Sequence, residues 1–147
     1  MIEKIKSELF KKYKNDDIKW IFFSLFDKKN NLLFSNGVLE TDKTMDKLID
    51  TLYHGLMDKI TWVKNVVIDI VLNYQQEKDL KKILSYSPKD YWFFLISIDW
   101  SQTGVLLPDT KWVSDIKQAL SYIKQKNWIS GNVEIYTFNT DRIVVSL

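Results

Sequence analysis

The sequence predicts an α+β domain in which a mixed, mostly antiparallel sheet is packed with helices. Two apolar runs, at residues 18–26 and 91–98, have the composition of strands buried on both faces. Three other segments, at residues 2–14, 45–56 and 111–126, repeat apolar residues at helical spacing. Strand and helix patterns occur in both halves of the chain, which is typical of an α+β fold.

The composition fits one globular domain, which we expect to span residues 1–147. Of the 147 residues, 46% are hydrophobic and 14% are aromatic, so the chain can build a self-sufficient core. Only 4 Gly and 2 Pro are present, which argues against long flexible linkers.

The cysteine count and the charge balance exclude several classes of function. With 0 Cys, the chain forms no disulfide, thiolate metal site or cysteine nucleophile, and we expect a cytoplasmic protein. No apolar run is long enough to span a membrane, and the N-terminus lacks the apolar centre of an export signal. The net charge is +2 and Arg142 is the only arginine, so we expect binding to neither nucleic acid nor membranes.

The first half predicts a helix, a hairpin and a second helix. The helix at residues 2–14 precedes the buried strand at 18–26. A polar turn at 27–31 then leads into a returning strand at 32–40. Residues 41–44 offer helix N-caps. The apolar stripe of the second helix is formed by Met45, Leu48, Ile49, Leu52 and Leu56.

The second half begins with an alternating segment at residues 62–74, which predicts an amphipathic strand. Asn65, Asp69 and Asn73 would form its polar face, which could line a cleft but is better interpreted as the wet face of an antiparallel sheet. The remaining elements are expected at residues 77–84 (helix), 91–98 (strand), 104–107 (strand), 111–126 (helix) and 133–138 (strand), with 142–146 extending or pairing with the last strand. The strand, helix and strand from 104 to 138 allow one parallel crossover.

The strongest apolar stripes contain Phe22, Ile68, Phe94 and Leu120, and we expect these four side chains to share one core. On that expectation, truncation of Phe94 to alanine costs about 3–5 kcal/mol of stability.

The only histidine, His54, has Asp50 and Asp58 at helical spacing on either side. Such a row could act as a general base or a weak metal site. Residues in one row along a helix do not converge on a metal, so a solvated helix face is the better interpretation. The chain has no phosphate-binding loop, dinucleotide fingerprint, nucleophile elbow or zinc spacing. We therefore expect no metal and no cofactor, and we lean against an enzyme.

The segment Ser35-Asn36-Gly37 is the first candidate binding site. A glycine inside a strand marks a bulge or a close backbone approach, and Asn-Gly also favours a tight turn. We expect this segment, rather than the His54 row, to carry the function.

The second candidate is Pro108-Asp109, where a strand end meets a helix start. Such junctions often bind phosphate, but Asp109 would place negative charge there. Asp109 or Thr110 as a helix N-cap is the simpler interpretation. Trp100 and Trp112 lie near loops rather than at core spacing, and exposed tryptophans of this kind mark interfaces.

The run Gly104-Val105-Leu106-Leu107-Pro108 resembles the glycine, aliphatic triplet and proline of the AMMECR domain family, named for the Alport syndrome chromosomal region. Residues 20–25, 66–72 and 133–138 resemble its early, middle and closing strands, in family order. The resemblance covers roughly residues 18–142. It implies an α+β fold in which a sheet packs with helices, with room for a smaller lobe.

One departure from the family concerns its Leu-Arg-Gly-Cys-Ile-Gly segment, the usual candidate for an active centre. The corresponding stretch here, residues 32–39, contains neither arginine nor cysteine. The resemblance therefore implies a divergent member whose chemistry has been lost or replaced.

Two functions from different classes stay open. The first is a non-catalytic binding or adaptor module of AMMECR-like fold. The alternative is a small enzyme or ligand-binding protein with a site near Ser35–Gly37 and the Pro108 loop. A closed surface there would favour the first and a deep polar pocket the second. The sequence does not identify the partner, whether protein or small molecule.

Overall fold

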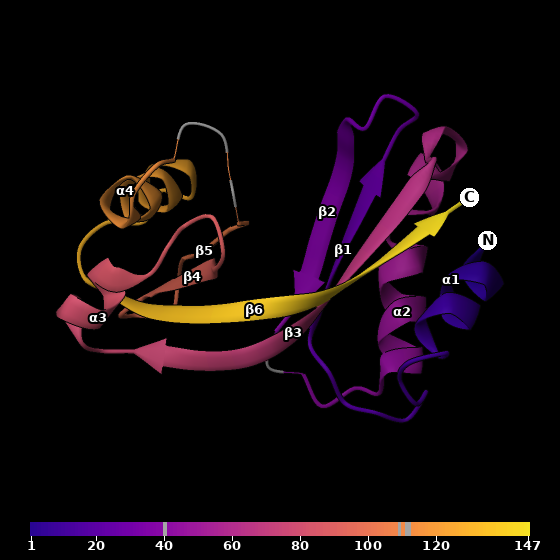
Figure 1. Ribbon diagram of the computed structural model, residues 1–147, viewed down its shortest axis with the longest axis horizontal. Helices are drawn as coiled ribbons and strands as arrows, with labels where there is room; N and C mark the ends of the chain where they lie inside the picture. Colours follow the sequence, from indigo (N-terminus) through magenta and orange to yellow (C-terminus); the bar gives the residue numbers. More distant parts are fainter. Residues whose placement is uncertain (40, 109, 111–112) are drawn as a thin grey trace. The chain divides into compact units, whose positions relative to one another are not determined.

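The structure is a computed structural model that describes residues 1–39, 41–108, 110 and 113–147, with the backbone alone for residues 57–59. Figure 1 shows the order of its elements along the chain. They are α1 (Ile2–Leu9), β1 (Ile21–Phe26), β2 (Leu32–Val38), α2 (Met45–His54), the 3-10 helix η1 (Met57–Trp62), β3 (Asn65–Glu77), α3 (Leu80–Ser85), β4 (Trp92–Ser97), β5 (Thr103–Leu106), α4 (Ile116–Lys126) and β6 (Val133–Ser146).

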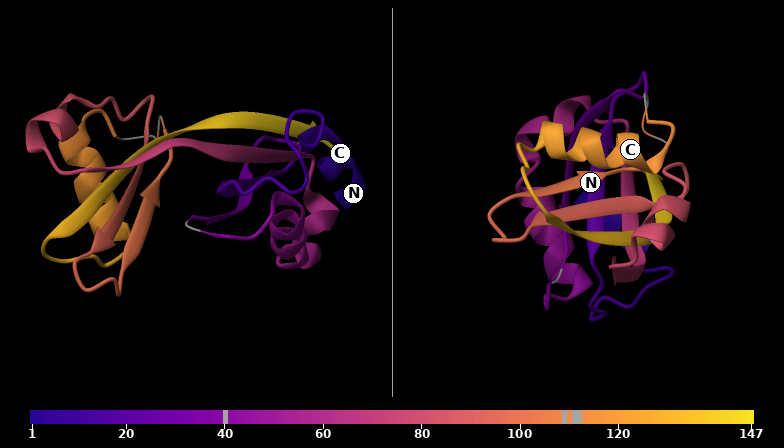
Figure 2. Two further views of the ribbon diagram at one scale, coloured as in Figure 1. Left: turned by 90° about the horizontal axis from the view of Figure 1, so that it is seen from below. Right: turned by 90° about the vertical axis from the view of Figure 1, so that its left-hand side faces the viewer.

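The chain forms two compact units. Unit 1 comprises Met1–Val71 and Thr140–Leu147, and unit 2 comprises Leu72–Asn139. The long strands β3 and β6 lie side by side and continue from one unit into the other (Figures 1 and 2). Unit 2 is therefore one uninterrupted segment, whereas unit 1 is built from two. The expectation of a single domain over residues 1–147 stays a prediction.

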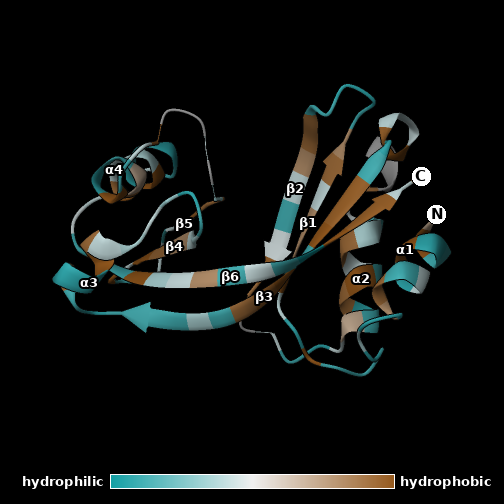
Figure 3. Ribbon diagram, in the orientation of Figure 1, coloured by the Kyte–Doolittle hydropathy of each residue, from teal (hydrophilic) through white to brown (hydrophobic). Residues whose placement is uncertain are grey.

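In unit 1 the strand order is β2-β1-β3-β6. Strand β1 pairs antiparallel with both β2 and β3. Residues near the start of β3 contact residues near the end of β6, as in the Ser146–Asn65 hydrogen bond, so this pair is antiparallel too. Strand β1 lies between two other strands, and its residues are mostly apolar and buried, as predicted (Figure 3).

Helices α1 and α2 cover one face of the unit 1 sheet. Their apolar stripes pack against alternate residues of β1 and β3, and all five predicted stripe residues of the second helix are buried. The buried cluster consists of Ile5, Leu9, Ile21, Phe23, Leu25, Met45, Leu48, Ile49, Leu52, Leu56, Val66, Ile68, Ile70 and Val145.

In unit 2 the strand order is β3-β6-β4-β5. Strand β4 pairs antiparallel with β5 and with β6, so β5 and β6 run parallel on either side of it, joined in sequence through α4. This is the predicted crossover, with one strand between its ends. Helices α3 and α4 pack on one face, where the buried cluster consists of Ile83, Phe93, Leu95, Leu106, Ile116, Ala119, Ile123 and Ile129.

The prediction of one shared core is wrong. Phe22 and Ile68 are buried, but Phe94 and Leu120 are only half-buried. The described residues form two separate clusters, with Ile68 in that of unit 1 and Leu120 at the margin of that of unit 2. Phe94 lies on the opposite sheet face from Phe93 and is close to Tyr136, with 6.1 Å between ring centroids. Its truncation should therefore cost less than a fully buried phenylalanine would.

The predicted wet face of the third strand is also wrong at its centre. Asp69 is 0% exposed, because Arg142 and Thr140 of β6 cover its carboxylate with hydrogen bonds. Further along β3, Asn73 has a φ of 54°, which interrupts the extended backbone inside the strand. The sequence pattern contained no sign of either feature.

Several element ends also differ from the predictions. Helix α1 ends at Leu9 and a turn follows, although the apolar stripe continues to Tyr13. Helix α4 begins at Ile116, where Asp115 caps it through a 2.9 Å bond from the Gln118 amide. No helix in the described part of the chain is long and apolar enough to cross a membrane.

Candidate functional site

Strand β2 is an edge strand, and its outer side is set by the hydrogen bonds of β1. The amide of Val71 donates to the Trp20 carbonyl and that of Lys64 to the Phe26 carbonyl, so the even-numbered residues of β1 pair with β3. The backbone groups of odd-numbered β1 residues therefore form hydrogen bonds with β2, at its residues 34, 36 and 38. The backbone groups of Ser35 and Gly37 consequently point away from the sheet.

The predicted site residues Ser35, Asn36 and Gly37 lie inside β2 rather than in a loop or tight turn, so that interpretation is corrected. The Ser35 hydroxyl is 3.0 Å from that of Ser24 on β1. The Asn36 side chain accepts the outward Gly37 amide at 2.9 Å, which covers one donor of the free edge.

Gly37 is a close-approach glycine. An added Cβ would lie 2.2 Å from the ring of Phe22, its partner across the strand pair. The bulge in this hairpin lies elsewhere, because the register shifts after Leu25 so that Leu33 is the extra residue. The group that restricts Gly37 is therefore a side chain, the Phe22 ring, and the bulge lies at Leu33.

Gly37 begins a row of residues that crosses the sheet of unit 1. Gly37 lies opposite Phe22 in the β1–β2 register, and Phe22 lies opposite Asp69 in the β1–β3 register. Asp69 accepts from Arg142 Nε at 2.9 Å and from Arg142 Nη2 at 3.0 Å, a bidentate pair, and from Thr140 at 3.0 Å. The Asp69 side chain is 1% exposed and that of Arg142 is 53% exposed, so a fixed cation lies at the surface end of the pair.

A hollow of about 630 Å³ lies beside β2 in unit 1 and involves its bulge residue. Its apolar lining comes from Leu33, Val63 and Trp62, whose side chain is 77% exposed. The hydrogen bonds from Asn31 hold the pKa of Asp27 below its ordinary value, so this lining carboxylate stays ionised at neutral pH. The remaining lining residues are Lys28, Lys29, Asn31 and Thr61.

The second predicted site does not join the first in one unit. Pro108 follows β5 in unit 2, whereas Ser35–Gly37 belong to unit 1. Asp109 lies outside the described residues. Thr110 is not the helix N-cap, since Asp115 caps α4 and the Thr110 hydroxyl donates to the Leu107 carbonyl at 2.7 Å.

Asp50 and His54 of the predicted row both lie in α2, whereas Asp58 follows in η1. His54 is exposed at the last position of α2, and Asp50 accepts from Lys6 at 2.8 Å. The side chain of Asp58 lies outside the described part. Among described residues, no three His, Cys, Asp or Glu side chains lie where they could hold a metal ion.

Two tryptophans of unit 2 have left-handed backbone, which is unusual for so bulky a residue. Trp100 has a φ of 63° and is 59% exposed, and Trp128 has a φ of 57° and is 85% exposed. The sequence indicates Trp100 as an exposed tryptophan, but it indicates neither Trp128 nor the Asp69–Arg142 pair. Trp112 lies outside the described residues. A helix commonly ends at a left-handed residue, usually glycine, and no glycine directly follows the predicted helix at 111–126. This was the only sequence signal that another residue near its end could have left-handed backbone.

No protein-family model matches the chain, and no curated protein matches it. Among solved structures, the chain is similar to the uncharacterized protein PH0010 from Pyrococcus horikoshii, with a TM-score of 0.70. The alignment covers 97% of this chain and 87% of that one at 13% identity. The two chains share a fold. The predicted class, α+β with a mostly antiparallel sheet packed with helices, is confirmed. The comparison shows the fold alone.

Proposed function

We propose that this chain is a non-catalytic binding module, a divergent AMMECR-like member acting in the cytoplasm, that receives an extended peptide along β2. The observation that carries the proposal is the outer edge of β2, which no strand of the described residues covers. Ser35 and Gly37 direct backbone donors and acceptors outward, where a partner strand can pair with them. Short side chains at Ser35 and Gly37 leave room for its backbone.

The neighbouring features supply specificity to such a site. The hollow beside Leu33 and Trp62 has space for an apolar side chain of the peptide. The Asn36 side chain occupies the Gly37 amide in the free protein, and a partner carbonyl would take its place. Asn36 would then protect the edge of β2 in the unbound state and release it for strand pairing in the bound state.

A small-molecule site is the alternative, and the same hollow favours it because its volume of about 630 Å³ suits a drug-sized ligand. The Pro108 loop of unit 2 does not contribute lining residues to this hollow. A ligand held there would depend on Trp62 and Leu33 and would be indifferent to the outward amide of Ser35.

Proline at position 35 separates the two functions. Proline removes only the outward amide, which an edge strand tolerates, and so blocks strand addition. Ser35→Ala is the matched control, because both variants lose the hydroxyl that contacts Ser24. Peptides selected from a random-sequence display library against the intact chain are the probe. We expect Ser35→Pro to weaken their binding roughly tenfold or more, whereas Ser35→Ala binds as the wild type does.

Equal binding of these peptides to folded Ser35→Pro and Ser35→Ala would overturn strand addition. If binding then falls on Trp62→Ala, the hollow alone is the site and the alternative function holds. Circular dichroism at the assay temperature confirms that each variant is folded.

A further inference from the structure

A second surface, in unit 2, is basic and carries exposed apolar side chains. Residues 78–85 and 115–132, which include α3 and α4, contain six lysines and two aspartates. Both aspartates are occupied as helix caps, Asp79 by the Lys81 amide and Asp115 by the Gln118 amide. The lysines are Lys78, Lys81, Lys82, Lys117, Lys124 and Lys126.

Most of this positive charge is uncompensated. Lys82 pairs with Glu77 at 3.4 Å, and Lys124 donates to the Gly131 carbonyl at 3.0 Å. The other four lysines are exposed and have no ion pair within the described residues. Helices α3 and α4 pack on the same sheet face, so their lysines belong to one layer. Its exposed apolar side chains are Leu80, Leu84, Tyr122 and Trp128.

Trp128 stands where glycine is expected. The amides of Trp128 and Ile129 donate to the carbonyls of Gln125 and Lys124, the hydrogen-bond pattern that closes a helix with a left-handed residue. That residue is usually glycine, because a side chain is disfavoured at positive φ. Here the position holds an indole that is 85% exposed and contributes little to the core. Residues held in a disfavoured backbone conformation cluster at functional sites.

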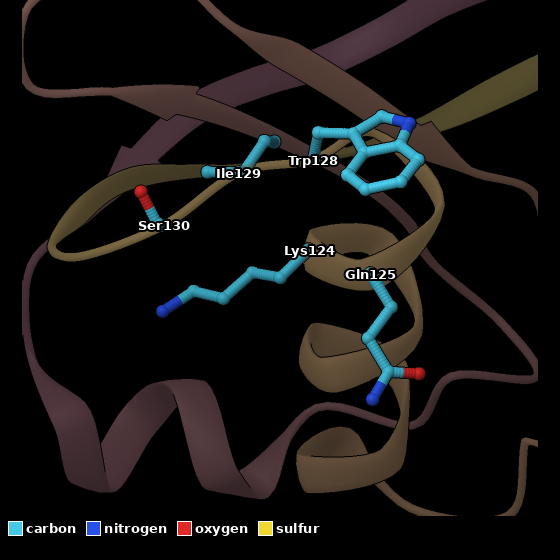
Figure 4. A pocket seen from close by; sticks show the side chains of 5 residues that line it. All are labelled: Lys124, Gln125, Trp128, Ile129 and Ser130. Atoms are coloured by element: carbon cyan, nitrogen blue, oxygen red, sulfur yellow. The ribbon is translucent and has the colours of Figure 1, made fainter.

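A hollow of about 380 Å³ lies beside this indole, lined by Lys124, Gln125, Trp128, Ile129 and Ser130 (Figure 4). Figure 4 shows the Lys124 side chain extending from α4 toward the loop of Ile129 and Ser130, which leads into β6. Trp128 lies above the end of the helix. Ser130 also lines a neighbouring hollow that contains Asp99. Hydrogen bonds from Ser97 and Ser101 lower the pKa of Asp99 to about 2, so that side of the surface stays negative.

We propose that this surface binds an acidic peptide segment of a partner protein, with one apolar side chain in the hollow beside Trp128 and its carboxylates over the lysines of α3 and α4. Charge complementarity selects the acidic partner and directs it away from Asp99. A nucleic acid is disfavoured, because the only arginine is bound to Asp69 in unit 1 and lysine does not make the bidentate phosphate contacts of arginine. A flat lipid surface presents no single side chain to fill the hollow beside Trp128.

The probe is a short peptide of Glu and Asp around a Leu-Glu-Glu-Phe centre, with a second version in which Gln replaces every acid. Binding to the intact chain is followed by fluorescence anisotropy at low and physiological salt. Oligo-dT and phosphatidylserine vesicles are offered in parallel. We expect the acidic peptide to bind, and we expect no binding of its Gln version, of oligo-dT or of the vesicles. The affinity for the acidic peptide should fall as the salt concentration rises.

Trp128→Gly should weaken this binding roughly tenfold or more without lowering Tm, since glycine accepts the left-handed backbone. Trp100→Gly is the matched control, because it makes the same change at a left-handed tryptophan beside Asp99 and should leave binding unchanged. The double variant Lys117→Gln/Lys126→Gln should weaken binding and flatten its salt dependence, whereas Lys89→Gln should not.

Absence of binding by the acidic peptide would overturn the proposal, as would equal affinity for Trp128→Gly and the wild type. Preferential, Trp128-dependent binding of oligo-dT or of vesicles would overturn it in favour of that other partner. The site is in unit 2, so the outcome is independent of Ser35→Pro and the edge of β2.

Discussion

An ideal Cβ at position 37 would lie 2.2 Å from Cδ1 and 2.5 Å from Cε1 of Phe22. The ring is itself buried, so it has little freedom to move away. At position 55, by contrast, the nearest atom to an added Cβ is 3.6 Å away and φ is −68°. Substitution by alanine should therefore affect the free energy of unfolding differently at positions 37 and 55.

We predict that Gly37→Ala lowers the free energy of unfolding by about 1–3 kcal/mol through overpacking against Phe22. Gly55→Ala is the control and should be neutral or stabilise by about 0.4–1 kcal/mol, because it restricts the unfolded chain. Urea unfolding followed by tryptophan fluorescence measures both. Equal effects of the two substitutions would show that the Phe22 ring does not restrict position 37.

Single residues also show where sequence reasoning ended. The glycine inside a strand predicted a bulge or a close backbone approach, whereas its close neighbour is the Phe22 ring, which could be named only once the register was known. The burial of Asp69 depends on Arg142, 73 positions later, and no local pattern contains that pairing. The left-handed backbone of Trp128 contradicts residue preference, so preference alone could not predict it.

At the scale of elements, the segment after α1 is joined to β6 through one carboxylate. Asp141 accepts from the Tyr13 hydroxyl at 2.5 Å and from Lys12 at 2.5 Å. Burial, followed by the hydrogen bond to Asp141, raises the pKa of Tyr13 to about 12. Lys12 and Tyr13 lower the pKa of Asp141. The end of the first helical segment is thereby tied to the last strand.

The Tyr13 pKa predicts a loss of stability in alkali. The unfolded chain releases the Tyr13 proton near the ordinary pKa of 10.0, whereas the folded chain keeps it up to about 12. The free energy of unfolding should therefore fall as pH rises through this window. Tyr13→Phe should remove that part of the pH dependence. Urea unfolding at several pH values in this window measures it, and the same pH dependence for the wild type and Tyr13→Phe would contradict the assignment.

Strands were easier to predict than helix ends. The runs that became β1 and β4 are apolar on both faces, and their residues are mostly buried. Such runs are visible locally in the sequence. The first helix was overextended because Tyr13 still packs against the unit 1 core after the chain has left the helix at Leu9. An apolar stripe reports which residues face the core, and it reports less about where the helix stops.

At the scale of the whole molecule, the same pair of strands contributes residues to two units, each with its own core. Strands β3 and β6 belong to both units and pair with each other. Composition and length predicted one domain, because neither quantity distinguishes one core from two. Contacts between residues far apart in sequence decide that number, and a single sequence does not show them.

We predict that the chain nevertheless unfolds in one transition, because loss of the β3–β6 pairing removes strands from both sheets at once. Urea unfolding followed by circular dichroism and by tryptophan fluorescence should give coincident curves. Native-state hydrogen exchange should give the same maximal protection for amides of β1 and of β4. Two separated transitions, or a large difference in maximal protection, would show that the units are independent domains.

The interrupted path of unit 1 has a consequence for synthesis on the ribosome. All of unit 2 is translated before residues 140–147, which complete the sheet of unit 1. The buried residue Val145 reaches its core only with that final segment. We therefore expect the part of the chain made first to finish folding last, leaving the edge of β3 that β6 will cover open to chaperones during translation.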